Sequence, residues 1–223
     1  MENFETQPSK KQKHIPFAIL CMIFEFIPLK TLLQKISLVC KEWYHCIFNH
    51  PPLWKLIEFH SYWSFSDFLA SDHTIPWGYI KILYYPGDDV EEEKCELYDI
   101  ASYANKMTSL ETIYWSCINL KRLNCLKFLT NLKSLNLTDC YYIYDIRALS
   151  ELTNLTRLGM IGCSRPNWDV LTNLKNLKAL ITDSDNLNPK IISQLTKLKT
   201  LSLKVSNLNM SEYLENLTNL TEL

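Results

Sequence analysis

Apolar residues follow two different patterns in the two parts of this chain. The segment 15–57 is denser in them than the whole chain, where they make up 47% of the residues. From residue 107 onward, leucines recur with a period of about 22 residues. The first pattern is typical of short packed helices, and the second is typical of a stacked repeat array. We therefore expect two modules of different architecture.

Helix signals divide the first segment into three parts. Isoleucines four residues apart predict a helix over about residues 17–27 that is apolar nearly all round, with Pro16 in its first turn and Pro28 at its end. Thr31 is suited to cap a second helix, and the "NHPP" of residues 49–52 ends a third. A module of this size cannot bury so much apolar surface internally. The excess is expected to cover either the rest of the chain, as a helical cap, or a second protein.

An ordered set of short motifs runs through the same segment. They are Ile-Pro at 15–16, Ile-Leu at 19–20, Ile-Phe at 23–24, Leu-Leu at 32–33, Val-Cys-Lys-Glu-Trp at 39–43 and Leu-Trp at 53–54. In order and spacing these motifs resemble the F-box. The resemblance implies three short helices that dock on a Skp-type adaptor and, through it, link the chain to a cullin–RING ubiquitin ligase. It places the following residues in the adaptor-binding surface or its support: Ile15, Pro16, Leu20, Phe24, Leu33, Val39 and Trp43.

The leucines of the second part follow the pattern Leu-x-x-Leu-x-x-Leu-x-Leu. This spacing and period are those of the leucine-rich repeat. Each copy predicts one short strand, and because no copy can bury its leucine row alone, stacked copies form one continuous core. Clear copies begin at Leu129, Leu152, Leu174, Leu195 and Leu217, and looser copies begin at Met107 and Trp77.

These observations predict an α+β fold in which a three-helix F-box precedes a leucine-rich-repeat solenoid. The solenoid is expected to have short parallel strands on one side and turns, 3-10 turns or short helices on its convex side. We expect residues 1–13 to be disordered, 14–60 to form the F-box, 61–106 to be a connector with degenerate first repeats, and 107–223 to form the repeats.

The strand residues between the buried leucines are candidates for binding, because successive residues of a strand point to opposite faces of a sheet. They lie on the concave face, which is expected to be polar, with an apolar patch at Ile161 and Ile181, and to bind a segment of a target protein. An ordinary solvated sheet face is the alternative. The candidate target contacts are Tyr114, Asn136, Arg157, Ile161, Ile181, Asp183 and Lys204.

One position in the turn after each strand also draws attention. In leucine-rich repeats, the position three residues after the second strand leucine normally holds Asn or Cys, which satisfies buried backbone groups. Here it holds Cys140, Cys163, Asp185 and Ser206. The two cysteines are therefore expected to be structural thiols.

Composition narrows the chemistry further. The formal net charge of −1 gives no electrostatic footprint for nucleic acid or a membrane surface, and four glycines leave no Gly-rich phosphate loop. No nucleophile or metalloprotease motif is present, so neither catalysis nor a cofactor is expected. Cys40, His45, Cys46 and His50 lie close together, but their spacing fits no common structural zinc pattern, so no metal is expected.

The sequence thus predicts a non-catalytic substrate-recognition subunit of a Skp–cullin–F-box ubiquitin ligase, whose repeats hold a target protein. Eight cysteines and no apolar leader favour reduced thiols in the cytoplasm, the nucleus or, for a viral chain, the host cytoplasm. Two alternatives stay open: an F-box scaffold or decoy that acts outside a ligase, and a plain leucine-rich-repeat protein-binding module. The target, and any modification it needs, cannot be read from the sequence.

Overall fold

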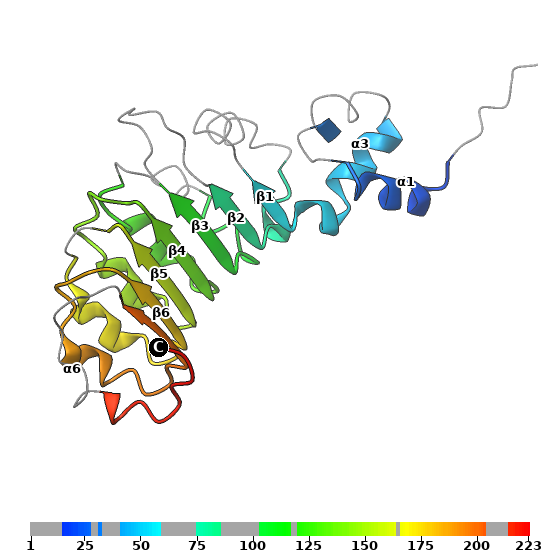
Figure 1. Ribbon diagram of the computed structural model, residues 1–223. Helices are drawn as coiled ribbons and strands as arrows, with labels where there is room; N and C mark the ends of the chain where they lie inside the picture. Colours follow the sequence, from blue (N-terminus) through cyan, green and yellow to red (C-terminus); the bar gives the residue numbers. More distant parts are fainter. Residues whose placement is uncertain are drawn as a thin grey trace, which may run out of the picture. The chain divides into compact units, whose positions relative to one another are not determined.

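The chain divides into two compact units, Met1–Leu53 and Trp54–Leu223 (Figure 1). The computed structural model describes residues 15–27, 31–32, 41–58, 75–85, 103–116, 120–163, 166–203 and 214–223. Within these ranges no helix is long and apolar enough to cross a lipid bilayer.

The first unit contains helices α1 (Phe17–Phe24) and α3 (Lys41–Phe48). The expected second helix falls largely outside the described residues. Pro16 precedes α1, and its carbonyl accepts hydrogen bonds from the N–H groups of the third and fourth residues after it, at 2.9 and 3.1 Å. Proline suits this place because an N–H there would have no helical partner.

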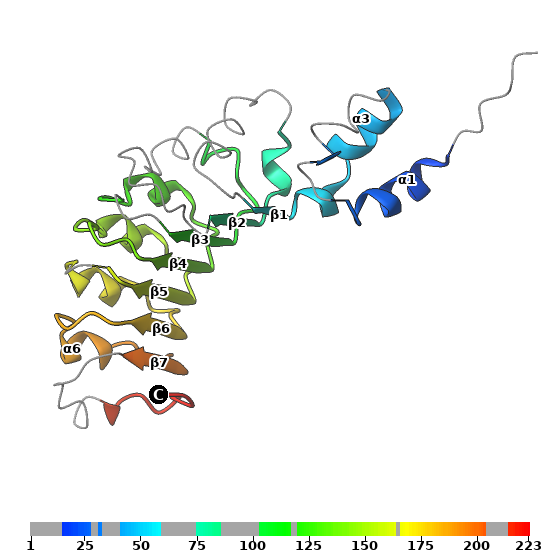
Figure 2. The ribbon, with the colours of Figure 1, turned by 45° about the horizontal axis from the view of Figure 1, so that its top comes forward.

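The second unit is a seven-stranded parallel sheet whose strands lie side by side in chain order. The strands are β1 (Leu56–Glu58), β2 (Ile82–Tyr85), β3 (Thr112–Ser116), β4 (Ser134–Thr138), β5 (Arg157–Ile161), β6 (Ala179–Thr182) and β7 (Thr200–Leu203). The 3-10 turns η5 (Asn124–Phe128), η6 (Arg147–Glu151) and η7 (Trp168–Asn173) and the short helix α6 (Pro189–Ile192) follow successive strands. Figure 2 shows the strands on the inner side of the curved array and these turns on its outer side. The solenoid predicted from the leucine pattern is confirmed.

The register of the sheet stacks equivalent apolar residues of successive copies in columns. One column consists of Ile113, Leu135, Leu158, Leu180 and Leu201. All of them are fully buried. Burial of each such side chain contributes about 1.5–3 kcal/mol. Because each lies between its equivalents in the copies before and after, the core runs through the whole unit.

The sheet begins earlier than the leucine pattern indicates. β1 pairs with β2, and its central residue Ile57 is buried. The apolar pattern predicts no strand in this stretch, which lies within the expected F-box of residues 14–60, because the leucine framework does not extend to it. The first compact unit ends at Leu53, so β1 belongs to the unit that contains the repeats.

An asparagine ladder joins neighbouring copies at the edge where the strands begin. The Nδ2 groups donate to backbone carbonyls of the preceding copy: Asn131 to Thr108 (2.8 Å), Asn154 to Thr130, Asn176 to Thr153 and Asn219 to Thr196 (2.9 Å each). Lys197 occupies the equivalent place in one copy, and its Nζ donates to Oδ1 of Asn176 at 2.8 Å. The ladder accounts for the recurring Asn-Leu pairs, because it satisfies turn carbonyls that the strands leave unpaired.

The turns after β4 and β5 are closed by buried thiols, as expected. The Sγ of Cys140 donates to a carbonyl of β3 at 3.8 Å, and the Sγ of Cys163 donates to a carbonyl of β4 at 3.7 Å. Each sulfur therefore pairs with a backbone group of the preceding copy. Both residues act as small apolar side chains with a weak donor.

In the next copy the buried turn residue is the neighbour of the one that the spacing indicates. Asp185 is exposed, whereas Ser184 is buried. The Oγ of Ser184 accepts a hydrogen bond from Nε1 of Trp168 at 3.2 Å. Ser206, the remaining candidate, lies outside the described residues.

Replacing Gly162 with Ala should destabilise the second unit. Its backbone has φ +69°, and an added Cβ would lie 2.8 Å from Oδ1 of Asp139. Strain of this kind costs about 1–3 kcal/mol, which urea unfolding followed by circular dichroism should detect. The matched control is Gly78→Ala in the turn η4 (Trp77–Tyr79), where the nearest atom would be 3.9 Å away. Equal losses in the two variants would contradict this account.

An ion pair after β4 should make stability depend on acid pH. Nε and a terminal nitrogen of Arg147 donate to the carboxylate of Asp145 at 3.0 and 2.8 Å and hold the pKa of that carboxyl at about 2. The stabilisation is complete above the ordinary carboxyl pKa and is lost as pH falls toward 2.

Asp145→Asn and Arg147→Ala should each lower the stability of the second unit only modestly at pH 7, because the arginine is 86% exposed and the pair is screened by water. The double variant should cost little more than either single one. Additive losses, or single variants whose stability between pH 4 and pH 2 falls as steeply as that of the unmodified chain, would refute the assignment.

Candidate functional site

Helix α1 has two apolar sides, of which one is buried and the other is exposed to solvent. One side, which carries Leu20, Cys21 and Phe24, is buried. The opposite side is exposed. Its residues recur four and seven positions apart and therefore share one face of the helix. We call this set, on α1 and the residues beside it, the α1 stripe: Ile15, Ile19, Met22, Ile23 and Phe26. Met22 is 60% exposed and Phe26 is 88% exposed.

The buried side of α1 packs on α3. The ring of Phe24 meets the ring of Trp43 edge-on, with centroids 5.5 Å apart. The Sγ atoms of Cys21 and Cys46 lie 3.0 Å apart and share a hydrogen bond. These contacts fix which side of α1 faces inward and therefore which side is left to solvent.

The middle row of the concave face crosses the sheet at one position of each strand. It consists of Tyr84, Tyr114, Asn136, Gly159, Ile181 and Ser202, paired strand to strand. Gly159 leaves room for its neighbour, since an added Cβ would lie 3.0 Å from Oδ1 of Asn136. That oxygen also accepts a hydrogen bond from Oγ1 of Thr138 at 3.1 Å. The asparagine is therefore held from two sides.

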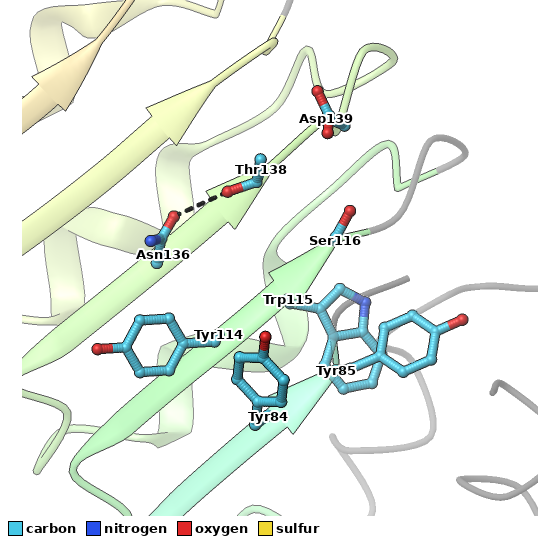
Figure 3. A pocket seen from close by; sticks show the side chains of 8 residues that line it. All are labelled: Tyr84, Tyr85, Tyr114, Trp115, Ser116, Asn136, Thr138 and Asp139. Carbon is cyan, nitrogen blue, oxygen red and sulfur yellow. Dashed lines mark hydrogen bonds between the residues drawn. The ribbon is translucent and has the colours of Figure 1, made fainter. Parts of the chain in front are cut away.

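A hollow of about 240 Å³ opens on the concave face near the ends of β2, β3 and β4. Figure 3 shows the rings of Tyr84 and Tyr114 projecting from adjacent strands, with Asn136, Thr138 and Asp139 further along β4. The centroids of the two tyrosine rings are 5.8 Å apart, and the ring planes are tilted by 57°. The hollow thus combines aromatic faces with polar groups.

Carboxylates gather at the edge where the strands end. Asp183 accepts the N–H of Gly162 with both oxygens, at 2.9 and 3.0 Å. The hydroxyl of Tyr141 donates to Oδ1 of Asp139 at 3.0 Å. This hydrogen bond, together with the charges of Asp139 and Asp183, raises the pKa of Tyr141. Both carboxylates therefore act on the same edge of the concave face.

Comparison with known proteins gives different matches for the N-terminal segment and for the repeats. Residues 13–60 match the F-box-like family model. The structure resembles the leucine-rich-repeat protein internalin C2 from Listeria monocytogenes, with a TM-score of 0.50 and 17% identity over 78% of this chain and 81% of that chain.

Another internalin of the same bacterium, InlF, aligns with a TM-score of 0.37 and 20% identity over 64% of this chain and 47% of that one. No significant match to curated proteins is found. At these identities, internalin C2 supports the repeat fold alone. The chain therefore combines an F-box-like domain with a leucine-rich-repeat solenoid.

Within the F-box-like domain, the predicted adaptor-binding residues occupy different places. Ile15 and Pro16 are exposed, Trp43 is half-buried, and Leu20 and Phe24 are buried. The last two can only support a docking surface. Leu33 and Val39 lie outside the described residues.

Sequence reasoning missed most of the α1 stripe. Ile19, Met22, Ile23 and Phe26 were not among the predicted contacts, although their spacing opposite Leu20 and Phe24 is visible on a helical wheel. What the sequence alone lacked was the position of α3, which decides between two equally apolar sides. Adaptor contact by any of these residues stays a prediction.

On the repeats, the predicted target contacts fall on separate rows. Tyr114, Asn136 and Ile181 share the middle row, whereas Arg157 begins β5 and Ile161 ends it. Asp183 follows β6, and Lys204 lies outside the described residues. Tyr84 was overlooked, although the strand alternation of the copy that begins at Trp77 indicates it. Contact with a target stays a prediction for all of them.

The cysteines and histidines considered for zinc have other neighbours. Cys46 faces Cys21, and Nε2 of His50 lies 2.6 Å from Oε1 of Glu25. Cys40 is outside the described residues. In the part of the chain that the structure describes, no cluster of three or more His, Cys, Asp or Glu could hold a metal ion.

Two buried thiols should resist alkylation in the folded protein. Burial raises the pKa of Cys46 to about 12, with the neighbouring Cys21 adding to the effect, and burial raises the pKa of Cys125 to about 12. Since the thiolate is the reactive form, iodoacetamide at pH 8 should leave both unmodified, as measured by mass spectrometry of peptides. The same chain in urea is the control. Rapid labelling of Cys46 before unfolding would show that the described packing of α1 on α3 is wrong.

Proposed function

We propose that this chain is the substrate-recognition subunit of a Skp–cullin–F-box ubiquitin ligase. Its F-box-like domain docks a Skp-type adaptor, and the concave face of its repeats holds a target protein. The chain makes and breaks no bonds itself. Its contribution is proximity, because holding the target beside the charged enzyme raises the effective concentration of the target lysine.

The observation that carries the proposal is the α1 stripe. Helix α1 has the sequence FAILCMIF, without a single charged residue. An exposed apolar face of this kind marks an interaction site in most soluble proteins. A helix of this type binds by laying its apolar side into an apolar groove. For an F-box-like domain, we expect the adaptor to supply that groove.

The thiols agree with a reducing compartment. The cysteines that the structure describes, Cys21, Cys46, Cys125, Cys140 and Cys163, are free. Such a pattern suits the cytoplasm or nucleus, where disulfides are rare. We propose the cytoplasm as the site of action, since the adaptor and cullin must meet the chain there.

The double variant Ile19→Glu/Ile23→Glu, made in the full chain, should abolish co-purification of the adaptor and cullin from cytosol. Anchor residues commonly contribute 2 kcal/mol or more each, and buried charges in an apolar groove add a further penalty. The matched control is Phe128→Glu, an apolar residue of the repeats that is 57% exposed. It should leave adaptor binding unchanged, and circular dichroism should show both variants folded.

The same purification separates the alternatives. Adaptor without cullin in the unmodified chain would indicate a scaffold or decoy. Absence of both would leave a plain repeat module and reject the proposal, as would full adaptor binding by the folded double variant.

A further inference from the structure

We propose that the hollow between Tyr84, Tyr114 and Asp139 accepts an arginine side chain from an extended segment of the target. This inference rests on the proposed function, because it assumes that the concave face binds protein. It adds the chemistry of the target: a basic segment rather than an acidic or phosphorylated one.

The size of the hollow favours a single side chain over a drug-sized ligand. The hollow measures about 240 Å³, below the roughly 300–1,000 Å³ of sites that enclose drug-sized ligands. A space of this volume suits one side chain. It lies on the face of the sheet, where an extended segment can run across the strands and insert that side chain.

The two tyrosines provide the walls. They are register partners on β2 and β3, both are half-buried, and their rings are 5.8 Å apart at a tilt of 57°. The tilt keeps the rings from stacking flat on each other, and both rings line the hollow. A guanidinium within about 6 Å of a ring centroid is attracted by the negative face of the ring. Arginine is preferred over lysine because its planar group also stacks.

The rim provides the charge. Asp139 contributes the one carboxylate among the residues that line the hollow, and no lysine or arginine is among them. The hydroxyl of Tyr141 donates to Oδ1 of Asp139 and so restrains the carboxylate, which is the type of group that binds a guanidinium most strongly. None of the ion pairs in the described part of the chain involves Asp139.

The surroundings extend the negative potential. Asp183 lies on the same edge, and both carboxylates raise the pKa of Tyr141. The concave cation nearest in sequence to this edge, Arg157, begins β5, whereas Asp139 follows the end of β4. Arg157 is the register partner of Ser134, five residues before Asp139, so the two positions are roughly 17 Å apart along the strand. A phosphate or a carboxylate in the hollow would therefore be repelled.

The test uses the full chain and capped amino acids as probes, followed by NMR of the tyrosine ring signals. N-acetyl-arginine amide should bind at millimolar concentration and shift the rings of Tyr84 and Tyr114. N-acetyl-citrulline amide has nearly the same shape without the charge, and it should bind about tenfold more weakly. N-acetyl-phosphoserine amide should not bind at the hollow.

Two variants locate the site. Asp139→Asn should weaken arginine binding about tenfold, and it keeps a residue that tolerates the φ of 54° found there. Asp169→Asn, which changes an exposed carboxylate in η7, is the matched control and should leave binding unchanged.

Equal binding of arginine and citrulline, preference for phosphoserine, or an Asp139→Asn variant that binds arginine as before would each overturn the inference. Adaptor binding is measured separately, by co-purification with and without the substitutions in the α1 stripe. A chain that fails to recruit adaptor but binds arginine in the hollow would refute the proposed ligase role and leave the pocket chemistry standing. A chain that recruits adaptor but does not bind arginine in the hollow would refute the pocket chemistry and leave the proposed ligase role standing.

Discussion

The rest of the repeat unit depends on how each copy is tied to the one before it. The carbonyl of Lys133, just before β4, accepts the N–H groups of both Thr156 and Arg157 in the next copy, at 2.8 and 3.1 Å. The equivalent carbonyl of Thr156 accepts two N–H groups of the copy after that, at 2.7 and 3.0 Å. A repeated bond of this kind fixes the offset between copies, and a one-residue slip would turn the leucine columns outward. The same fixed offset also aligns the side chains that alternate with the leucines, so these side chains form rows on the concave face.

Local periodicity made most of this predictable. A leucine framework that recurs at nearly constant spacing reports the strands, the stacking and the outer turns without any long-range information, and the structure contains them. The errors occur where that framework is broken. Strand β1 follows Pro51 and Trp54 at positions where the clear copies have leucines, and after β6 the buried turn residue is Ser184 rather than Asp185. Gly159 was not among the candidate residues, because a residue without a side chain adds nothing to the apolar and polar pattern. It nevertheless makes room for Asn136.

The helical unit shows the opposite situation. Its motifs are specific enough to reveal the F-box-like domain, but its hydrophobic pattern is uninformative about orientation, since Leu20 and Ile19 look alike in sequence. Orientation is a tertiary property: the contact of Phe24 with Trp43 decides it. The predicted docking residues therefore mix buried support with exposed surface, and the separation needed coordinates. The hollow on the concave face needed them too, because it is made by tyrosines from two copies and a carboxylate from a third.

The two surfaces proposed for binding differ in their physical chemistry, and on the proposed function this difference bears on how one chain serves two partners. The α1 stripe is uncharged and apolar, so binding through it follows buried area and responds little to salt. The edge of the concave face carries Asp139 and Asp183, so a basic segment would be attracted from a distance and released more easily as ionic strength rises. An apolar groove gains nothing from the carboxylates, and a basic segment gains nothing from the stripe. On the proposed function, the apolar surface gives a stable attachment to the adaptor, whereas the charged surface allows targets to exchange faster. Each surface also excludes the other's ligand by its chemistry.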